Sequence, residues 1–245
     1  MLPYWLSAWL SASSTSYLQF GRGASIFLAF MQILYLIRHG ETAHNRDGRV
    51  QGHTESDLSD MGREQAARIA DRLSKVPFVA AYSSPLRRAW DTCQIAIGDR
   101  MDVTAHMGLR EINLGSWEGK KASALRKQYP VDVKEWFRRP TRVNIEGAET
   151  IRVFRNRVVT TMNEILNAHD EGAVAVFAHG GVICTYLTSV LNMRLDDIWR
   201  FKIRNGSVTR VLFPMESPRV DLLGDVHHLD GLLRPPPAKS FRLFP

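Results

Sequence analysis

Short apolar runs, separated by longer polar and amphipathic stretches, are found along most of this chain. Residues 33–37 (ILYLI), 78–82 (FVAAY) and 172–178 (GAVAVFA) contain no charged side chain. Runs of this length, rich in branched and aromatic residues, are typical of strands that are buried on both faces of a sheet. We therefore expect central strands at these three positions.

The stretches between these strands predict helices. After a polar loop over 41–57, Ser59 or Asp60 can cap a helix in which apolar residues recur on one face, namely Ala66, Ile69, Ala70 and Leu73. Further helical segments are expected from 83–85 onward, over 120–170 with a loop at 140–150, and over 182–191. Strands that alternate with helices favour an α/β fold, here a single domain with a doubly wound, mostly parallel sheet flanked by helices.

The two ends of the chain differ from this central part. Residues 1–30 are apolar and rich in Ser, with Arg22 as their one charged side chain. They have no basic start, and Ser and Gly interrupt their apolar runs before the roughly 18 residues that a membrane span needs. We interpret 1–30 as a disordered or spurious extension, with a targeting segment as the alternative. The domain is then expected over 31–232 and a Pro-rich tail over 233–245.

Composition and charge narrow the classes of partner. The chain has 245 residues and a formal net charge of +7, which suits an acidic ligand. Its basic residues are scattered and not interleaved with aromatic ones, so we expect neither a nucleic-acid partner nor a membrane partner. Cys93 and Cys184 stand alone, which argues against a disulfide framework or a zinc site and favours a cytoplasmic location.

Basic side chains and histidines follow the predicted strands directly. Arg38 and His39 come after the first strand, His179 follows the strand over 172–178, and Arg88 falls near the first turn of the helix after 78–82. In an open α/β sheet, ligands bind beyond the carboxyl ends of the strands. We expect these four side chains to meet at that edge.

This set of residue types fits phosphoryl transfer. The transition state spreads negative charge over three oxygens, and Arg38, Arg88 and His179 can bind them. Further contacts to phosphate are expected from the Asn45 side chain and from the backbone amides of Gly40, Gly52 and Gly180.

The two remaining roles are those of nucleophile and proton donor. A neutral His39 can attack phosphorus and form a phosphohistidine, which divides the reaction into two steps. Glu111, in the loop over 109–115, can protonate the leaving alcohol and then deprotonate the incoming water or acceptor.

Five separated motifs carry a resemblance to a known family. In chain order they are LIRHGET (36–42) followed by Asn45, SPLRRA (84–89), LRE (109–111), GSWEG (115–119) and AHGG (178–181). With these motifs in this order, the chain resembles the histidine phosphatase superfamily, also called phosphoglycerate mutase-like, from Met31 to Leu229.

The resemblance implies a role for each residue of the motifs. His39 would be the phosphorylated residue and Glu111 the proton donor. The phosphate pocket would consist of Arg38, Arg88 and His179, with supporting contacts from Asn45, Gln51 and Gly52. The resemblance also implies that the enzyme uses no metal ion and no organic cofactor.

Other residues compete for these roles. Arg87 adjoins Arg88, but neighbouring side chains on a helix point about 100° apart, and the family pattern of Arg directly before Ala selects Arg88. Glu41 and Glu118 are rivals of Glu111 as the acid, and we assign Glu41 to structural pairing with an arginine.

The other histidines receive no role in catalysis. We interpret them as surface or loop residues: His44, His53, His106 and His169. The pair His227–His228 resembles two metal ligands, but neighbours on an extended chain face opposite sides. Residues 224–229 instead resemble the closing strand of the family.

Hydrolysis and isomerisation share this chemistry, but a mutase must hold a second phosphoryl acceptor and exclude water. Cofactor-dependent mutases are expected to carry ERHYG after the acid, where this chain has EINLGSWEG over 111–119, the form typical of the smaller phosphatases. We therefore predict a phosphomonoesterase. A phosphoglycerate-mutase-type phosphotransferase is the alternative, kept open by Arg138-Arg139-Pro140, and a non-catalytic pseudoenzyme that binds phosphorylated ligands is a remote one.

The sequence does not choose the phosphate ester. Broad-specificity, α-ribazole-phosphate, sugar-phosphate and phosphoprotein phosphatases all fit. We expect a lid over 120–149 to set specificity through a mixed aromatic and basic wall, formed by Trp136, Phe137, Arg138, Arg139 and Arg142. The expected partner is a small phosphorylated substrate, and a homodimer is left open.

Overall fold

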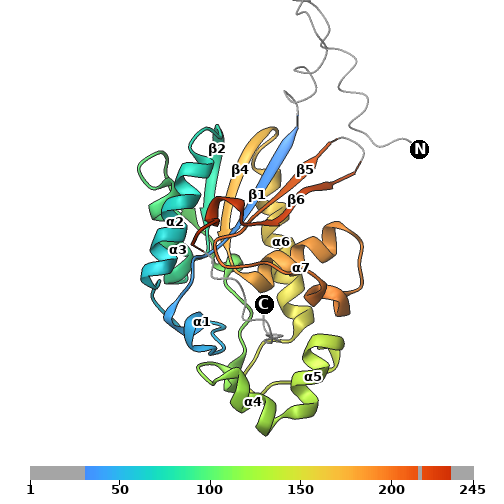
Figure 1. The fold of residues 1–245 in the computed structure, drawn as a ribbon. Helices are drawn as coiled ribbons and strands as arrows, with labels where there is room; N and C mark the ends of the chain where they lie inside the picture. The colour runs from blue at the N-terminus through green and yellow to red at the C-terminus, as the bar shows by residue number, and fades with distance from the viewer. Residues whose placement is uncertain (1–30, 215–216, 233–245) are drawn as a thin grey trace, which may run out of the picture.

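A six-stranded mixed sheet lies at the centre of the computed structural model, which describes residues 31–214 and 217–232 (Figure 1). The strand order is β3-β2-β4-β1-β5-β6. The strands are β1 (Gln32–Arg38), β2 (Phe78–Ser83), β3 (Val103–Ala105), β4 (Gly172–Ala178), β5 (Val208–Phe213) and β6 (Arg219–Asp225). Four neighbours, β3, β2, β4 and β1, are parallel, and β5 is antiparallel to both β1 and β6. The expected doubly wound, mostly parallel α/β fold is confirmed.

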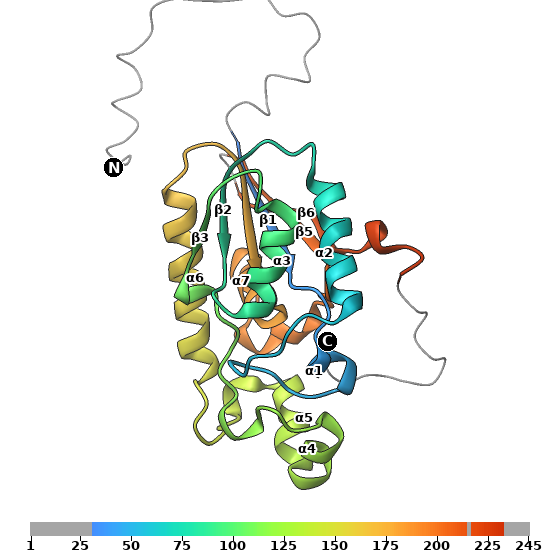
Figure 2. The same ribbon diagram turned by 90° about the vertical axis from the view of Figure 1, so that its left-hand side faces the viewer.

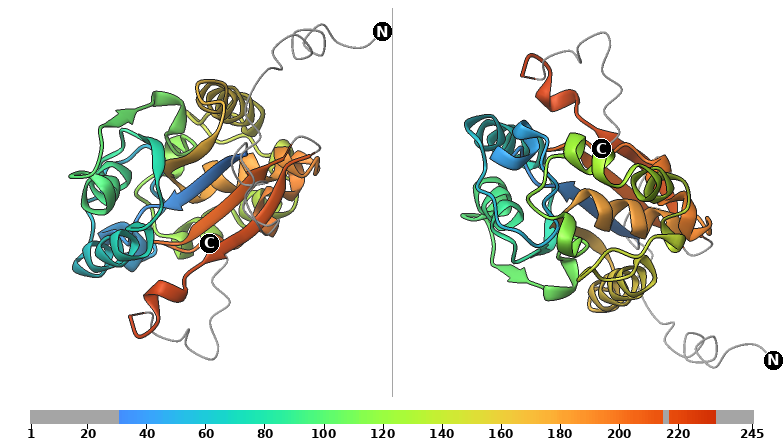
Figure 3. Two further views of the ribbon diagram at one scale, coloured as in Figure 1. Left: turned by 90° about the horizontal axis from the view of Figure 1, so that it is seen from above. Right: turned by 90° about the horizontal axis from the view of Figure 1, so that it is seen from below.

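Helices cover both faces of this sheet, as Figures 2 and 3 show. The α-helices are α1 (Ala43–Asp47), α2 (Asp60–Leu73), α3 (Arg87–Ile97), α4 (Ala122–Gln128), α5 (Pro130–Arg138), α6 (Ile151–Asn167) and α7 (Gly180–Val190). The short 3-10 helices are η3 (Met107–Leu109), η4 (Gly115–Trp117), η5 (Pro140–Arg142), η6 (Leu195–Arg200) and η7 (His227–Leu229).

Alternation along β1 explains why there are two apolar cores. Successive side chains of a strand point to opposite faces of the sheet. Leu34 and Leu36 therefore pack with α6 and α7 in one buried cluster, whereas Tyr35 and Ile37 pack with α2 and α3 in the other. A central strand that is apolar on both faces holds the two helix layers together.

Several elements differ from those expected. The predicted polar loop over 41–57 contains α1, which Thr42 caps. The helix after β2 begins at Arg87, two residues beyond Pro85, and not at 83–85. The closing strand expected over 224–229 is wrong in its bounds, because β6 ends at Asp225 and η7 follows. The cap at Ser59 is confirmed, since its Oγ accepts the Gly62 amide at 3.1 Å.

The expectations for the two ends of the chain, 1–30 and 233–245, fall outside the described residues, and the domain boundaries stay a prediction. Within the part that the structure describes, no helix has the length and apolar character needed to cross a membrane.

The loop after β1 lies directly on the start of α2. A Cβ at Gly62 would lie 2.0 Å from the Glu41 carbonyl oxygen, and a Cβ at Gly40 would lie 2.4 Å from the Gly62 carbonyl oxygen. Both near atoms belong to the backbone, which cannot move aside without shifting the loop. Helix α2 therefore fixes the path of the chain just beyond Arg38.

We predict that Gly62→Ala lowers the free energy of unfolding by about 1–3 kcal/mol, because the added methyl group overpacks this backbone contact. Urea unfolding of the purified variant measures the loss. Arg63→Ala is the matched control, since the Arg63 side chain is exposed on the same helix turn. Equal unfolding midpoints for the two variants would contradict the prediction.

Candidate active site

Three parallel strands bring the predicted site residues to one edge of the sheet. The register pairs Arg38 of β1 with Ala178 of β4, and Ser83 of β2 with Phe177 of β4. The residues that follow these strand ends are therefore neighbours in space. The rings of His39 and His179 lie with their centroids 5.2 Å apart. Arg38, His39, Arg88 and His179 are all buried, at 6, 2, 1 and 0% exposure.

The environment of His39 fixes its proton. Its Nδ1 lies 2.7 Å from the Gly40 carbonyl oxygen, which can only accept a hydrogen bond, so the proton of a neutral ring sits on Nδ1. The lone pair is then on Nε2. Burial, followed by the nearby charges of Arg88 and Arg38, holds the pKa of His39 well below its usual value. The buried ring is therefore a neutral potential nucleophile.

His179 is also buried and neutral. Its Nε2 lies 2.8 Å from Ser84 Oγ, and its Nδ1 is buried without a partner in the described residues. Burial is the largest cause that lowers its pKa well below the usual value, and Arg88 adds to the effect. If the Ser84 hydroxyl donates to Nε2, then Nδ1 carries the proton and is a donor without an acceptor.

The two buried arginines are held by backbone carbonyls. Arg38 Nη1 donates to Ile203 O at 2.5 Å, whereas Arg88 donates from Nη2 to Gly52 O at 2.7 Å and from Nη1 to Thr54 O at 3.1 Å. The Nε atoms of both arginines are buried and have no partner within the described residues. Burial lowers the pKa of Arg88 to about 10, although the charge of Glu111 opposes this shift.

Glu111 lies beside the start of α7. Its Oε2 accepts the Gly181 amide at 3.0 Å, and its Oε1 accepts the Ile112 amide at 2.9 Å. A Cβ at position 181 would lie 2.3 Å from Oε1, so only glycine allows this approach. Its charge raises the pKa of both Arg38 and Arg88, which places the carboxylate next to the two cations.

The predicted supporting residues surround the same pocket. Asn45 Oδ1 accepts the Thr42 amide at 3.2 Å, and Gln51 Oε1 accepts the Thr42 hydroxyl at 3.1 Å. Gly52 contributes its carbonyl to Arg88, as described above. Gly180 packs on the Arg38 guanidinium, since a Cβ there would lie 3.3 Å from its Cζ.

Glu118 and Glu41, the two rivals of Glu111 as the acid, accept hydrogen bonds from neighbouring loops. Glu118 accepts the amides of His53 at 2.9 Å and Thr54 at 2.8 Å, and thereby holds the loop whose carbonyls bind Arg88. Glu41 accepts the Ser59 hydroxyl at 2.9 Å, whereas its expected pairing with an arginine stays a prediction. Arg87 is exposed and pairs with Asp57 at 3.2 Å, in contrast to the buried Arg88.

Sequence reasoning missed three residues of this site. His53 was assigned to the surface or to a loop, but its Nε2 lies 2.8 Å from the Glu111 carbonyl oxygen. Ser84 stands inside a quoted motif and contacts His179, although no role was assigned to it. Asn205 donates to the carbonyl oxygens of His39 at 3.2 Å and Gly40 at 3.3 Å. A turn-forming Asn-Gly pair at 205–206 was the one local signal for this third residue.

The expected aromatic wall of the lid packs inward. Trp136 is 5% exposed, and its ring centroid lies 6.1 Å from that of Trp117 and 5.7 Å from that of Trp199. Phe137 also packs on Trp199, at 6.2 Å. Trp136 and Phe137 therefore pack with other rings of the core, and these contacts stabilise the lid from within.

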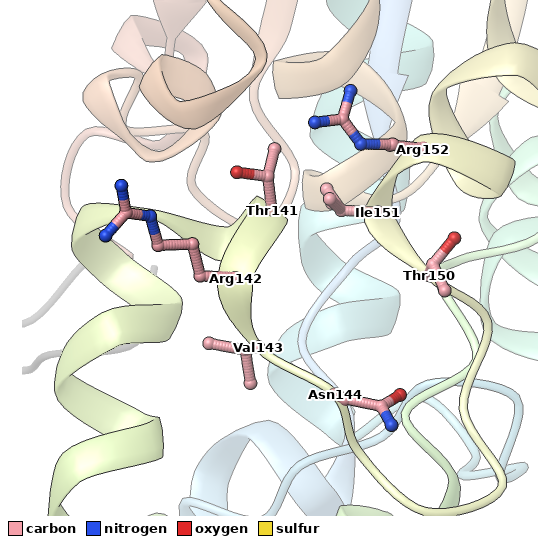
Figure 4. Close-up of a pocket in the computed structure, with 7 residues that line it drawn as sticks. All are labelled: Thr141, Arg142, Val143, Asn144, Thr150, Ile151 and Arg152. Carbon is pink, nitrogen blue, oxygen red and sulfur yellow. The ribbon is translucent and has the colours of Figure 1, made fainter.

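The basic residues of the lid divide into two groups. Arg138 and Arg139 both pair with Glu135, whereas Arg142 lines a cavity of about 260 Å³ (Figure 4). This cavity lies between η5 and the start of α6, and Arg152 also borders it. None of the predicted catalytic residues lines the cavity, so it is separate from the cluster around His39.

The His227–His228 pair does not form a metal site with its neighbours. His227 pairs with Asp230 at 2.9 Å, and His228 Nε2 lies 3.0 Å from the Gly206 carbonyl oxygen. Among the residues that the structure describes, no group of three or more His, Cys, Asp or Glu side chains is arranged to hold a metal ion.

Comparison with known proteins agrees with this geometry. The model of the histidine phosphatase superfamily (branch 1) matches residues 34–226. Phosphoserine phosphatase 1 of Hydrogenobacter thermophilus is 32% identical over 175 residues, which are 71% of this chain and 83% of that protein. Phosphoglycerate mutase-like protein 4 of Arabidopsis thaliana is 34% identical over 203 residues, 80% of this chain and 86% of that protein.

A solved structure has the same fold. Bacillus stearothermophilus YhfR is 31% identical and has a TM-score of 0.77, over 81% of this chain and 100% of that one. The family match extends over most of the chain and includes every strand end that carries a site residue. The chain therefore belongs to the histidine phosphatase superfamily and is a phosphatase, a phosphoric monoester hydrolase of that family.

Proposed function

We propose that this protein hydrolyses small phosphate monoesters through a phosphohistidine intermediate at His39. The observation that carries the proposal is a buried cluster with an excess of donors. Arg38 Nε and Arg88 Nε are buried without acceptors in the described residues, and so is His179 Nδ1 when Ser84 donates to His179 Nε2. Buried cations and N–H groups without acceptors are costly. A phosphoryl group would supply the missing negative charge and acceptors.

The first step uses the lone pair on His39 Nε2. The Glu111 carboxylate first takes the acidic proton of the bound ester's monoanion. The His39 nitrogen then attacks phosphorus, the bond between phosphorus and the ester oxygen breaks, and Glu111 gives this proton to the departing oxygen. Arg38, Arg88 and His179 bind the three remaining oxygens, on which negative charge accumulates. The His39 Nδ1–H bond to Gly40 stabilises the ring as it becomes a phosphorylated cation.

The second step returns the site to its starting state. Glu111, now a carboxylate, takes a proton from a water molecule that attacks the phosphohistidine. The bond between Nε2 and phosphorus breaks, and its electron pair returns to the imidazole. Glu111 passes its proton to inorganic phosphate, which leaves, and His39 is neutral again with its proton on Nδ1.

The relatives support the phosphate-ester class but differ in substrate. Some are named for phosphoserine, one for glucosyl-3-phosphoglycerate at 33% identity, and one structure for α-ribazole-5'-P at 25% identity. We propose hydrolysis over isomerisation because residues 111–119 have the form typical of the smaller phosphatases, and Glu118 of that stretch is committed to holding the loop over 52–54. The phosphoglycerate-mutase-type reaction stays the alternative.

The proposed function is tested with a panel of phosphate esters. It includes phosphoserine, glucosyl-3-phosphoglycerate, α-ribazole phosphate, sugar phosphates and 3-phosphoglycerate, each scored for phosphate release and for isomerisation. Release from at least one ester, with no isomerised product, is the expected result. Isomerisation faster than release would establish the mutase alternative, and binding without turnover of any ester would establish a pseudoenzyme.

We predict that His39→Ala abolishes phosphate release and the acid-labile phosphoenzyme together, because the variant lacks the Nε2 lone pair that the proposed first step uses. Rapid acid quench with a radiolabelled ester measures the trapped phosphate. His227→Ala is the control, since the His227 ring is exposed and pairs with Asp230 away from the cluster around His39. A phosphoenzyme that persists in His39→Ala would refute the assignment.

We predict that Glu111→Gln slows turnover of alkyl phosphates by about 10²–10⁴-fold, the usual contribution of general acid catalysis. An aryl phosphate with a good leaving group needs little protonation, so its phosphoenzyme formation should slow far less. Steady-state and burst kinetics on both esters give the comparison, and Glu146→Gln, an exposed carboxylate, is the control. Equal losses for the two leaving groups would remove Glu111 from the role of acid.

We predict that the enzyme keeps its activity as the pH falls through 6.5, the ordinary pKa of histidine. The lowered pKa of His39 means that protonation, which removes the lone pair, occurs only at more acidic pH. The profile of kcat/KM is measured with two esters whose phosphate groups ionise at different pH. An acidic limb that lies at or above 6.5 for both esters would show that His39 is not kept neutral.

A further inference from the structure

We propose that Asn205 is a positioning residue for phosphoryl transfer: its side-chain amide orients both the reacting His39 and the phosphate-facing amide of Asn45. The inference rests on the proposed function, because it assigns a residue that acts through His39. Asn205 lies in the loop between η6 and β5, outside every motif that carries the family resemblance. Its contacts with the site come entirely from the tertiary structure.

The NH₂ group of Asn205 has two hydrogens and faces three acceptors, so at least one hydrogen is shared between two of them. Its Nδ2 lies 3.2 Å from His39 O, 3.3 Å from Gly40 O and 3.1 Å from Asn45 Oδ1. Two of these acceptors are backbone carbonyls, which cannot donate. The atom that faces them must therefore be the NH₂ group, so the orientation of this amide follows from the backbone alone.

The first consequence concerns the tautomer of His39. The Gly40 carbonyl that receives Asn205 Nδ2 also receives the His39 Nδ1–H, at 2.7 Å. Asn205 thus holds in place the acceptor that keeps the proton on Nδ1 and the lone pair on Nε2. A second bond from Asn205, to the carbonyl of His39 itself, restrains the backbone that carries the imidazole.

The second consequence concerns Asn45. Its Oδ1 faces the Thr42 amide at 3.2 Å, the Thr42 hydroxyl at 3.1 Å and Asn205 Nδ2 at 3.1 Å. Because the oxygen faces these donors, the NH₂ group of Asn45 is turned the other way. Asn205 therefore presents Asn45 Nδ2 as a donor for a phosphate oxygen.

The loop itself is held by other bonds. The Gly206 amide donates to the carbonyl oxygens of Arg38 at 3.2 Å and His39 at 3.0 Å, and the Arg38 amide donates to Ser207 O at 3.1 Å. Arg38 Nη1 also donates to Ile203 O. These bonds use backbone atoms at 203, 206 and 207, so replacing the side chain at 205 leaves the loop attached to β1.

The experiment compares Asn205→Asp with Asn205→Ala. Asp has nearly the shape of Asn but places a carboxylate oxygen against three acceptors, whereas Ala only removes the donors. If Asn205 positions the site through its N–H groups, Ala lowers the rate of phosphoenzyme formation by about 10–100-fold, by analogy with the loss seen when the outer hydrogen-bond partners of metal-binding histidines are removed. Asp then lowers it further, despite its better fit.

The matched control is Arg204→Ala, a neighbouring exposed side chain in the same loop, which should retain wild-type rates. Urea unfolding shows which conditions keep every variant folded, and rates are compared only there. If Asp retains more activity than Ala, the side chain acts by filling space, and the proposal is wrong. Rates for both variants within about twofold of the wild-type enzyme would overturn it too, since such a ratio is below 0.5 kcal/mol.

A double-mutant cycle separates positioning from general destabilisation. Asn45→Ala is measured alone and together with Asn205→Ala. Because Asn205 orients Asn45, the loss caused by Asn45→Ala should be smaller in the Asn205→Ala background than in the wild-type enzyme. Additive losses would contradict the proposal. A wild-type enzyme that forms no phosphoenzyme with any ester would instead refute the proposed function, so the two failures are distinct.

Discussion

Two buried guanidinium groups in one pocket are the constraint on which the rest of the site depends. Arg38 and Arg88 are removed from water, and the charge of Arg38 also lowers the pKa of Arg88. The protein offsets this cost with backbone carbonyls from Ile203, Gly52 and Thr54. Among the carboxylates that act on Arg88, Glu111 has the largest effect. The Nε atoms of both arginines still lack an acceptor within the described residues. A phosphoryl group has the oxygens that could accept from them.

Much of the surrounding structure serves to place those carbonyls. Glu118 binds the amides of His53 and Thr54, so it fixes the loop whose carbonyl oxygens meet Arg88. The loop over 203–207 attaches to the end of β1 and supplies the carbonyl for Arg38. A carboxylate in a family motif can therefore act on the chemistry without touching the substrate. This explains why Glu118 is a poor candidate for the acid despite its position in the sequence.

The same desolvation determines how His39 can react. Burial and the charges of the two arginines lower the pKa of His39 well below its usual value, so the imidazole stays neutral. The Gly40 carbonyl then decides which nitrogen carries the proton, and Asn205 holds that carbonyl. The glycine at 181 lets Glu111 approach the start of α7, close to the same cations. Nucleophile, pocket and acid are thus parts of one electrostatic arrangement.

The sequence by itself determined the central strands, the α/β class and the residues at the strand ends, because these signals are local. A run such as 33–37 indicates a buried strand, and parallel strands end at one edge of the sheet. The sequence alone therefore predicted that Arg38, His39, Arg88 and His179 lie close together. The strands β5 and β6 were harder to predict from the sequence, because charged residues such as Arg210 and Asp221 interrupt their apolar pattern. Only the tertiary structure decided that Trp136 packs inward, that His53 reaches the Glu111 carbonyl and that Asn205 donates to the His39 carbonyl. The last contact joins residues 166 positions apart, and no local pattern records a hydrogen bond across such a separation.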